Sequence, residues 1–379
     1  MAGVFDESVA AFLSPIKDYL ADDSVSEVLV NGAGEIFIER KGILERTNSK
    51  FLDEQALIAA VRNIAQFVGR RIDENNPILD ARLPDGSRVA AVIPPCSRKG
   101  TTLSIRKFSK GNPTFVDLIN FGSISKEAAR FLDVCVYLAK NIIVSGGTGS
   151  GKTTLLNVIG ARIPGHQRLL IIEDSTELKI KTDHVVYFET KHPDSEGNGE
   201  VSIRDLVRSS LRLRPDRIVV GEVRGEEALD LITAMNTGHG GSMGTTHANS
   251  SYDALVRLET LAMMGAANIP IQALRRQIAS AVHIVTQIKR MNDGTRKVTN
   301  ITEVFPEVDE QGRYVIRDIF CYVQRGKTAD GKIVGEMVAT GHIPSFMQEI
   351  EINLLPFGRE KFTAPSWYLD LIQDGKIAA

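Results

Sequence analysis

A nine-residue segment near the middle of the chain has the glycine, lysine and threonine content of a phosphate-binding loop. Gly146, Gly151, Lys152 and Thr153 satisfy the pattern G-x-x-x-x-G-K-[ST]. Glycines let successive backbone N–H groups turn inward around a phosphate, and a following helix adds the positive end of its dipole. We expect the Lys152 ammonium to reach the β- and γ-phosphates and the Thr153 hydroxyl to ligate Mg²⁺. The segment therefore predicts binding of ATP or a similar nucleoside triphosphate. The predicted nucleotide-binding residues are Gly146, Gly147, Thr148, Gly149, Ser150, Gly151, Lys152, Thr153 and Thr154.

Two glutamates follow apolar runs that are predicted to be strands. Glu173 ends the segment Leu169–Glu173, and Glu222 comes shortly after Arg217–Val220. Ligands of open α/β sheets bind at the carboxyl ends of the strands. One carboxylate could position or deprotonate the attacking water, and the other could hold Mg²⁺ in its outer shell. Glu222 is therefore a second candidate for the metal site beside Thr153, and Arg224 in the same strand-end segment is a further catalytic candidate.

Two histidines, His239 and His247, lie in the glycine-rich stretch TGHGGSMGTTHANS. A zinc site is disfavoured because no cysteine or carboxylate stands at ligand spacing from them. An imidazole can donate a hydrogen bond to a phosphate and respond to its loss. We interpret the stretch as one polar loop whose two histidines sense the γ-phosphate.

The elements around these residues predict a parallel sheet with helices. Ile142–Val144 is a short β-branched run of the kind that forms a buried strand, and apolar residues from Leu155 to Ile159 open a helix. A further helix is predicted over Lys126–Lys140. Alternating helix and strand patterns in this region favour a mainly parallel sheet.

The first part of the chain reads as a separate α+β domain. A helix is predicted over Val9–Leu20, strands over residues 27–30 and 35–39, and a helix over Asp53–Gly69 with Asp53 as its N-cap. Asp85-Gly86 between two strand-like runs predicts a hairpin, and Thr101–Phe108 alternates as a strand. Arg88 and Arg106 are the arginines of this domain that we regard as functional candidates, because each lies on a strand that fixes its direction.

The predicted organisation has four parts. Residues 1–108 form the N-terminal α+β domain, residues 109–124 the linker and residues 125–305 the nucleotide-binding domain. Residues 306–379 form a C-terminal appendage with strands around a Gln311-Gly312 turn. Residues 109–113 contain Gly, Asn and Pro, which is typical of a break between domains.

Composition limits the classes of partner. The 379 residues are 43% hydrophobic and 24% charged, with 45 Lys+Arg against 47 Asp+Glu, so the net charge does not favour binding to nucleic acid or an anionic membrane. The basic segment LRLRPDR lacks the interleaved aromatics of a base-stacking surface. No apolar run approaches the roughly 18 residues of a membrane span, and the acidic start does not resemble a signal peptide. Three scattered cysteines favour reduced thiols in a cytoplasmic protein.

The order of the motifs resembles the type II/IV secretion ATPase superfamily. GGTGSGKTT, IIEDSTEL, RSSLRLRPDRIVVGEVRG and MNTGHGGSMGTTHANS are similar to its Walker A motif, Asp box, atypical Walker B motif and His box. In the first domain, GRRIDE, PILDARLPDGSRV and SIRKF resemble the tight-adherence (CpaF/TadA-type) pilus branch. The resemblance covers residues 20 to 305 and is weak beyond them.

The resemblance implies a RecA-like P-loop ATPase domain preceded by a smaller PAS-like α+β domain. It implies that Glu173 is the catalytic glutamate, that Glu222 is the Walker B acid, and that His239 and His247 form the His box. Arg88 and Arg106 would reach the nucleotide phosphates. The family forms homo-hexameric rings that bind ATP between the two domains, on the cytoplasmic side of an inner-membrane pilus platform protein.

The predicted function is therefore an ATP-hydrolysing motor that assembles a tight-adherence type IV pilus, with retraction as an additional activity to test. The chain would meet the membrane only through its protein partner and would bind no nucleic acid. The alternatives are a type IV secretion or conjugation traffic ATPase, an archaellum-type motor, a nucleic-acid translocase and a nucleotide-gated switch without turnover.

Overall fold

The chain divides into two compact units in this computed structural model. The first unit is Met1–Gly111 and the second is Asn112–Ala379. The structure describes residues 11–40, 42–83, 85–108, 111–191, 193, 198–265 and 269–374.

The first unit is built on a six-stranded sheet in which every neighbouring pair is antiparallel. The strand order is β3-β2-β1-β6-β5-β4. The strands are β1 (Val25–Asn31), β2 (Ile36–Arg40), β3 (Ile43–Arg46), β4 (Ile78–Arg82), β5 (Arg88–Val92) and β6 (Thr102–Arg106). The helical segments of this unit are η1 (Ser14–Ile16), α2 (Lys17–Ala21) and α3 (Glu54–Phe67). The α+β class predicted for this part of the chain is confirmed.

The local signals in this unit act as expected. The Asp53 carboxylate accepts a hydrogen bond from the Ala56 amide at 2.8 Å, which confirms it as the N-cap of α3. The Asp85-Gly86 hairpin joins β4 and β5, and Gly86 has the positive φ of +87° that such a turn requires. The predicted helix at Val9 begins outside the described residues, and its remainder forms η1 and α2.

One face of this sheet is covered by α3 and the other carries polar side chains. Residues at alternate positions, such as Val28, Leu103 and Ile105, are fully buried in one hydrophobic cluster with Leu57 and Ile64 of α3. Side chains at the intervening positions point to the opposite face, and Arg106 is among them. The alternation in the strands therefore decides which side chains remain available for a ligand.

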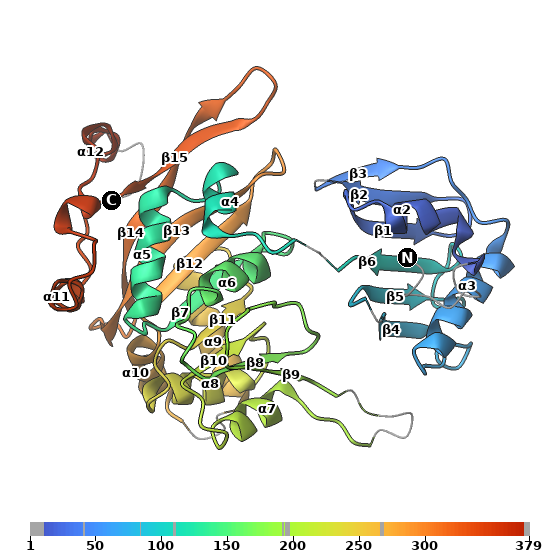
Figure 1. Cartoon of the computed structure of the whole chain (residues 1–379), viewed down its shortest axis with the longest axis horizontal. Helices are drawn as coiled ribbons and strands as arrows, with labels where there is room; N and C mark the ends of the chain where they lie inside the picture. The colour runs from blue at the N-terminus through green and yellow to red at the C-terminus, as the bar shows by residue number, and fades with distance from the viewer. Residues whose placement is uncertain are drawn as a thin grey trace. The chain divides into compact units, whose positions relative to one another are not determined.

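The second unit contains a nine-stranded sheet of order β15-β14-β13-β12-β7-β11-β10-β8-β9 (Figure 1). Neighbours from β12 to β9 are parallel, and neighbours from β12 to β15 are antiparallel. The strands are β7 (Ile142–Gly146), β8 (Leu169–Glu173), β9 (Val185–Glu189), β10 (Arg217–Val220), β11 (Met243–Thr246), β12 (Ile284–Arg290), β13 (Arg296–Val308), β14 (Tyr314–Lys327) and β15 (Ile333–Ala339).

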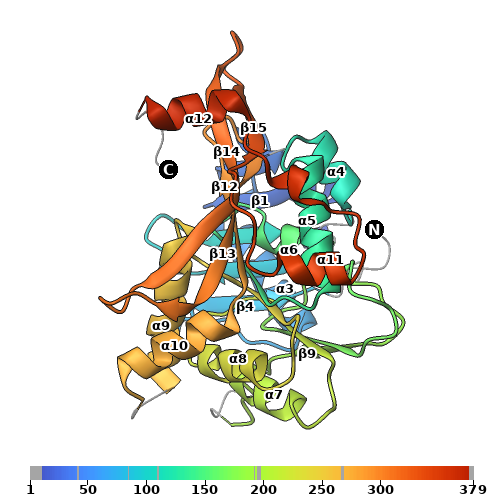
Figure 2. The ribbon, with the colours of Figure 1, turned by 90° about the vertical axis from the view of Figure 1, so that its left-hand side faces the viewer.

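Helices cover both faces of this sheet. They are α4 (Phe115–Asn120), α5 (Lys126–Tyr137), α6 (Lys152–Gly160), α7 (Ile203–Ser210), α8 (Glu227–Asn236), α9 (Ser251–Gly265), α10 (Ile271–Ala281), α11 (Met347–Ile352), η2 (Arg359–Phe362) and α12 (Ser366–Gln373). Ile142 and Val144 of β7 share a hydrophobic cluster with α5 and α6, whereas Ile143 belongs to the cluster that includes α8, α9 and α10. Figure 2 shows these two groups of helices on opposite sides of the sheet.

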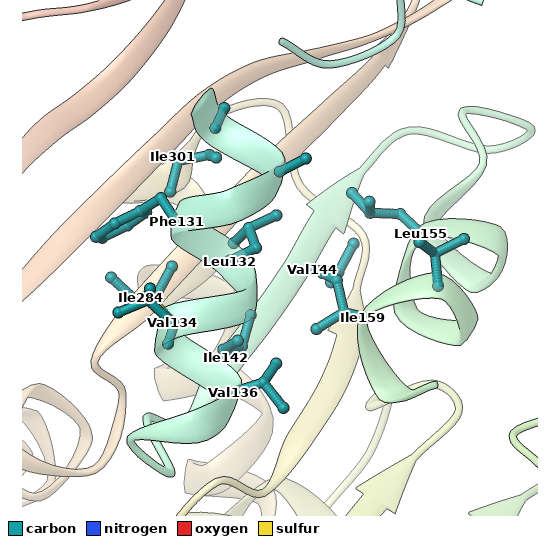
Figure 3. Packing of buried hydrophobic residues seen from close by; sticks show 14 of the residues in the cluster. Phe131, Leu132, Val134, Val136, Ile142, Val144, Leu155, Ile159, Ile284 and Ile301 are labelled. Atoms are coloured by element: carbon teal, nitrogen blue, oxygen red, sulfur yellow. The ribbon is translucent and has the colours of Figure 1, made fainter. Parts of the chain in front are cut away.

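Burial on both faces explains the apolar sequence of the central strands. All five residues of β7 and of β8 are buried, which is typical of a parallel strand between two helix layers. Figure 3 shows Phe131, Leu132 and Val136 on α5 beside the strands that carry Ile142, Val144 and Ile284, with Leu155 and Ile159 on α6. The packing holds the end of β7, and hence the loop after it, in a fixed place.

The C-terminal residues add to this same unit. The strands predicted around Gln311-Gly312 are β13 and β14, and the predicted boundary at residue 305 lies inside β13. Phe131 of α5 is surrounded by four phenylalanine rings whose centroids lie 5.7–6.1 Å from its own: Phe320, Phe346, Phe357 and Phe362. Two of these rings, those of Phe357 and Phe362, follow α11, so residues well beyond β15 complete the core around α5.

Candidate active site

The predicted phosphate loop joins β7 to α6. Gly149 and Gly151 have φ values of +68° and +98°, a region in which other residues are strained, and Gly151 is the N-cap of α6. A Cβ atom at Gly146 would lie only 2.3 Å from the Ile288 carbonyl oxygen, so this position also requires glycine. The tip of the loop at Gly147, Thr148 and Gly149 is exposed. The loop therefore presents backbone at the start of a helix, as an anion site requires.

Three side chains from adjacent strand ends meet beside this loop. Lys152 starts α6, Glu222 follows β10, and His247 follows β11, which lies between β7 and β10 in the sheet. The Lys152 ammonium is 3.1 Å from the Gly147 carbonyl oxygen and 3.3–3.4 Å from the two His247 ring nitrogens. His247 Nε2 is 3.0 Å from a Glu222 carboxylate oxygen. Parallel strands thus bring together residues that are up to 95 positions apart in sequence.

This environment favours the neutral form of His247. Burial lowers the pKa of the imidazole below its ordinary value, and the positive charge of Lys152 lowers it further, against the opposing effect of Glu222. A neutral ring has one N–H donor and one acceptor nitrogen. His247 can therefore accept from one neighbour and donate to another at neutral pH.

Glu173 lies further along the same edge of the sheet. It ends β8, and β11 and β10 stand between β8 and β7. The carboxylate is 3% exposed and accepts hydrogen bonds from the Glu177 and Leu178 amides at 2.9 and 3.0 Å. A Cβ atom at Gly221 would come within 2.8 Å of Glu173 Cγ, so Gly221 allows this side chain to lie against β10. Glu173 therefore holds the segment after β8 in place.

Arg224 also lies at this edge. Its guanidinium forms an ion pair with the Asp174 carboxylate, which directly follows Glu173. The Arg224 amide and the neighbouring Gly225 amide donate to the Glu227 carboxylate at 2.7 and 2.8 Å. Arg224 thus lies among the strand-end residues, and its guanidinium is paired with Asp174, which follows the neighbouring strand β8.

The structure corrects the interpretation of the histidine pair as members of one polar loop. The residues between them include β11, a fully buried strand of the sheet. His247 follows β11 at the edge that carries Lys152, whereas His239 precedes β11 and lies at the opposite edge. There the His239 amide donates to Ala234 and its carbonyl oxygen accepts from the Ser242 hydroxyl at 2.7 Å. His247 joins the site and His239 does not.

Arg88 and Arg106 belong to the first unit and are direct neighbours there. Arg88 on β5 is in register with Arg106 on β6, and Arg82 on β4 is in register with Arg88. Residues directly opposite each other share one face of a sheet, so three arginines stand in a row on the face away from α3. Like charges at such positions repel each other, which makes this row a suitable place for a polyanion.

The residues present fit Mg²⁺ bound together with nucleotide. Among the residues that the structure describes, no group of three or more His, Cys, Asp or Glu side chains could hold a metal by itself. Mg²⁺ uses one or two protein ligands plus phosphate oxygens and retains several waters, so a protein cage is not needed. The Thr153 hydroxyl at the start of α6 is the side chain that would ligate the ion directly, and the Glu222 carboxylate would hold it in its outer shell, through a water.

Sequence reasoning missed a second contact with the phosphate loop. Arg290 and Arg296 flank the turn between β12 and β13, and Arg296 Nε donates to the Gly149 carbonyl oxygen at 3.0 Å. The signal was present as Asp293-Gly294 between two strand-like runs, which predicts a hairpin with an arginine on each arm. Only the pairing of β12 with β7 reveals that this hairpin meets the loop.

Comparison with known proteins identifies the family. The family described as type II/IV secretion system protein matches residues 10–344. The chain belongs to this family. The match confirms the predicted superfamily and a P-loop ATPase, and it extends over both units of the chain.

Curated relatives agree with this membership. This chain is 35% identical over 326 residues to the type IV secretion system protein VirB11 of Brucella suis, covering 79% of this chain and 90% of that protein. It is 31% identical over 336 residues to VirB11 of Bartonella henselae, covering 78% of this chain and 94% of that protein.

Solved structures confirm the fold. The pilus retraction motor PilT with bound ADP is 18% identical, with a TM-score of 0.52 over 96% of this chain and 89% of that one. The ATPase DotB of Yersinia pseudotuberculosis is also 18% identical, with a TM-score of 0.54 over 80% of this chain and 81% of that one. This chain thus has the predicted RecA-like ATPase fold with an N-terminal domain. Within its described residues, no helix combines the length and apolarity needed to span a membrane.

Proposed function

We propose that this secretion system protein is a hexameric motor that hydrolyses ATP with Mg²⁺ at the cytoplasmic face of the inner membrane to assemble a tight-adherence type IV pilus. The observation that carries the proposal is the group formed by Lys152, His247 and Glu222 beside the phosphate loop. Lys152 offers a cation for the phosphates and Glu222 a carboxylate for the attacking water, which are groups that phosphoryl transfer to water uses. The neutral imidazole of His247 lies between them.

Each residue of this group has a distinct task. Lys152 and the loop amides would bind the phosphates, and the Thr153 hydroxyl would give an oxygen ligand to Mg²⁺, which when bound would offset negative charge on the phosphates. Glu222 orients the attacking water and accepts its proton. His247 contacts both Lys152 and Glu222, so it lies where it can sense whether a γ-phosphate is bound.

The geometry supports a different division of roles between Glu222 and Glu173 from the one that the family resemblance implies. Glu222 contacts His247 directly, whereas Glu173 is buried one strand further from β7 and bonded to backbone amides. We propose Glu222 as the catalytic carboxylate and Glu173 as the residue that positions the strand end beside it. This assignment replaces the role that the family resemblance implied for Glu173.

Replacing Glu222 by glutamine should lower the kcat for ATP hydrolysis by about 100-fold or more while ATP still binds, since glutamine keeps the shape but cannot accept the proton. Glu173→Gln should lower kcat much less, because the amide oxygen can still accept from Glu177 and Leu178. Steady-state hydrolysis and equilibrium ATP binding of both variants test the assignment. A larger loss of kcat in Glu173→Gln than in Glu222→Gln would reverse it.

Motion requires that the first unit respond to the nucleotide. Moving a two-state arrangement from about 1:99 to 99:1 takes roughly 5.5 kcal/mol of differential binding. Two or three charge-assisted hydrogen bonds at about 1.5–3 kcal/mol each supply that amount. Arg88 and Arg106 are our candidates for such bonds to the γ-phosphate, made when ATP binds and lost after hydrolysis.

The mass of the protein in solution tests the motor proposal. Light scattering with a non-hydrolysable ATP analogue should give about six times the 41.5 kDa mass of the chain. Without nucleotide we expect the same mass or partial dissociation. A monomer under both conditions would contradict the ring and favour a nucleotide-gated switch.

The choice of a pilus rests on the first-domain segments GRRIDE, PILDARLPDGSRV and SIRKF. A second candidate is a type IV secretion traffic ATPase, which the 35% identity to VirB11 of Brucella suis favours. The two differ in the inner-membrane partner, a pilus platform protein or a secretion channel. Deletion of the gene should remove surface pili in the first case and abolish substrate transfer with pili retained in the second.

A further inference from the structure

The hairpin between β12 and β13 lies against the phosphate loop. Besides the bond from Arg296 Nε to the Gly149 carbonyl oxygen, the Arg296 stem lies over Gly151, where a Cβ atom would be 3.2 Å from Arg296 Cδ. Arg290, the register partner of Arg296, has a guanidinium nitrogen 3.7 Å from the Cβ position at Gly149. The two arms of one hairpin thus contact the two glycines of the loop that have positive φ.

The turn that carries these arginines is rigid. The Asp293 carboxylate accepts from the Thr295 amide at 3.0 Å and from its hydroxyl at 2.6 Å. The Met291 amide donates to Thr295 at 2.7 Å, and the Gly294 amide donates to Met291 at 2.9 Å. The other Asp293 oxygen accepts from the Ile333 amide at the start of β15 at 2.7 Å. Because the turn is anchored on two sides, Arg296 is held where it meets the loop.

The loop needs support from outside. Its N–H groups turn inward to a phosphate, which leaves carbonyl groups such as that of Gly149 facing outward. Its glycines have no side chains to restrain the backbone, so an unsupported loop loses much conformational entropy when a ligand orders it. A donor that is already fixed on the outer surface reduces this cost before the ligand arrives.

We propose that Arg296, with Arg290 packed beside it, is a positioning residue that holds the phosphate loop in its nucleotide-binding conformation. Their positive charges also favour the triphosphate over less charged ligands. The inference rests on the proposed function, because it concerns the affinity of the same loop for ATP. It assigns to the β12–β13 hairpin a role in nucleotide binding rather than in the chemical step.

The test compares Arg296→Ala, Arg296→Lys and the control Arg313→Ala. Arg313 lies at the β13–β14 turn, away from the phosphate loop, and donates to the Asp309 carboxylate at 2.8 Å. Equilibrium binding of a non-hydrolysable ATP analogue with Mg²⁺, kcat at saturating ATP and the Tm without nucleotide are measured for each. Arg296→Ala should weaken binding about tenfold, as expected for loss of one charge-assisted hydrogen bond. Its kcat and nucleotide-free Tm should stay close to those of the wild type.

Arg296→Lys keeps the charge and the stem and should restore part of the affinity, whereas Arg313→Ala should bind as the wild type does. Should Arg296→Ala fail to fold, the lysine variant and Arg290→Ala carry the test, and each should bind ATP several-fold more weakly. Wild-type affinity in the Arg296 variants would overturn this inference alone. A wild-type chain that binds no ATP analogue would overturn the proposed function and this inference with it.

Discussion

Replacing Lys152 by alanine should abolish tight ATP binding and lower ATP hydrolysis on the order of 10³-fold or more. The Lys152 side chain is nearly buried, with its ammonium between the Gly147 carbonyl oxygen and the His247 ring. In this setting it is the cation that the phosphates would meet, and a charge-assisted contact in a partly buried site is stronger than one in water. Calorimetric titration with a non-hydrolysable ATP analogue, followed by a hydrolysis assay, measures both effects.

Lys140 provides a matched control for this variant. It is as buried as Lys152, at 8% against 7% exposure, but it precedes β7 instead of following it and pairs with Glu349 at 2.8 Å. Lys140→Ala should lower stability through loss of that pair and leave ATP affinity unchanged. Normal ATP affinity in Lys152→Ala would show that the loop does not bind nucleotide in the way proposed.

Replacing Arg106 by alanine should lower kcat on the order of 10³-fold, and Arg88→Ala should have a similar effect, if the row reaches the γ-phosphate as arginine fingers do. These residues belong to a different unit from the phosphate loop, so a large effect would demonstrate that the first unit takes part in catalysis. Single-turnover hydrolysis with saturating ATP separates this effect from weaker binding.

Arg46→Ala is the corresponding control. Arg46 stands on β3 of the same sheet and bonds to Glu35 at 2.8 Å, away from the row formed by Arg82, Arg88 and Arg106. Its replacement should leave kcat within about twofold, as expected for an exposed ion pair. Wild-type turnover in both Arg88→Ala and Arg106→Ala would remove the row from the mechanism.

The sequence was informative where short-range rules act. The spacing of Gly146, Gly151 and Lys152 is itself the geometric requirement of the phosphate loop, so the loop and the helix after it could be predicted without a fold. The N-cap Asp53 and the Asp85-Gly86 turn depend only on their immediate neighbours. The fully apolar runs at β7 and β8 predicted strands covered on both faces.

The sequence predicts the wrong local structure at β11, where a buried strand position requires a residue as small as glycine. Met243–Thr246 is a buried strand, yet glycine and threonine in a glycine-rich context favour a loop by composition. The structure shows why Gly244 is there: a Cβ atom would lie 3.2 Å from Val223 Cγ2. Because the composition hides this strand, the sequence alone places His239 and His247 in one loop although β11 separates them.

The other features that the sequence does not predict are contacts between residues far apart in the chain. Phe131 and the four phenylalanines around it lie between residues 131 and 362 without periodic spacing, so no local pattern predicts that they meet. The meeting of Arg296 with Gly149 likewise spans 147 positions. Such contacts follow from strand order, which short motifs do not encode.

The phenylalanine cluster around Phe131 has a consequence for the order of events during synthesis on the ribosome. A nascent chain that has been made as far as β15 already contains the phosphate loop and every strand of the sheet, yet it lacks Phe346, Phe357 and Phe362. Until those three rings arrive, α5 exposes apolar surface that chaperones recognise, and a truncated chain would present the same surface permanently. We therefore expect the ATPase to become resistant to proteolysis only when its last helical segments have been released.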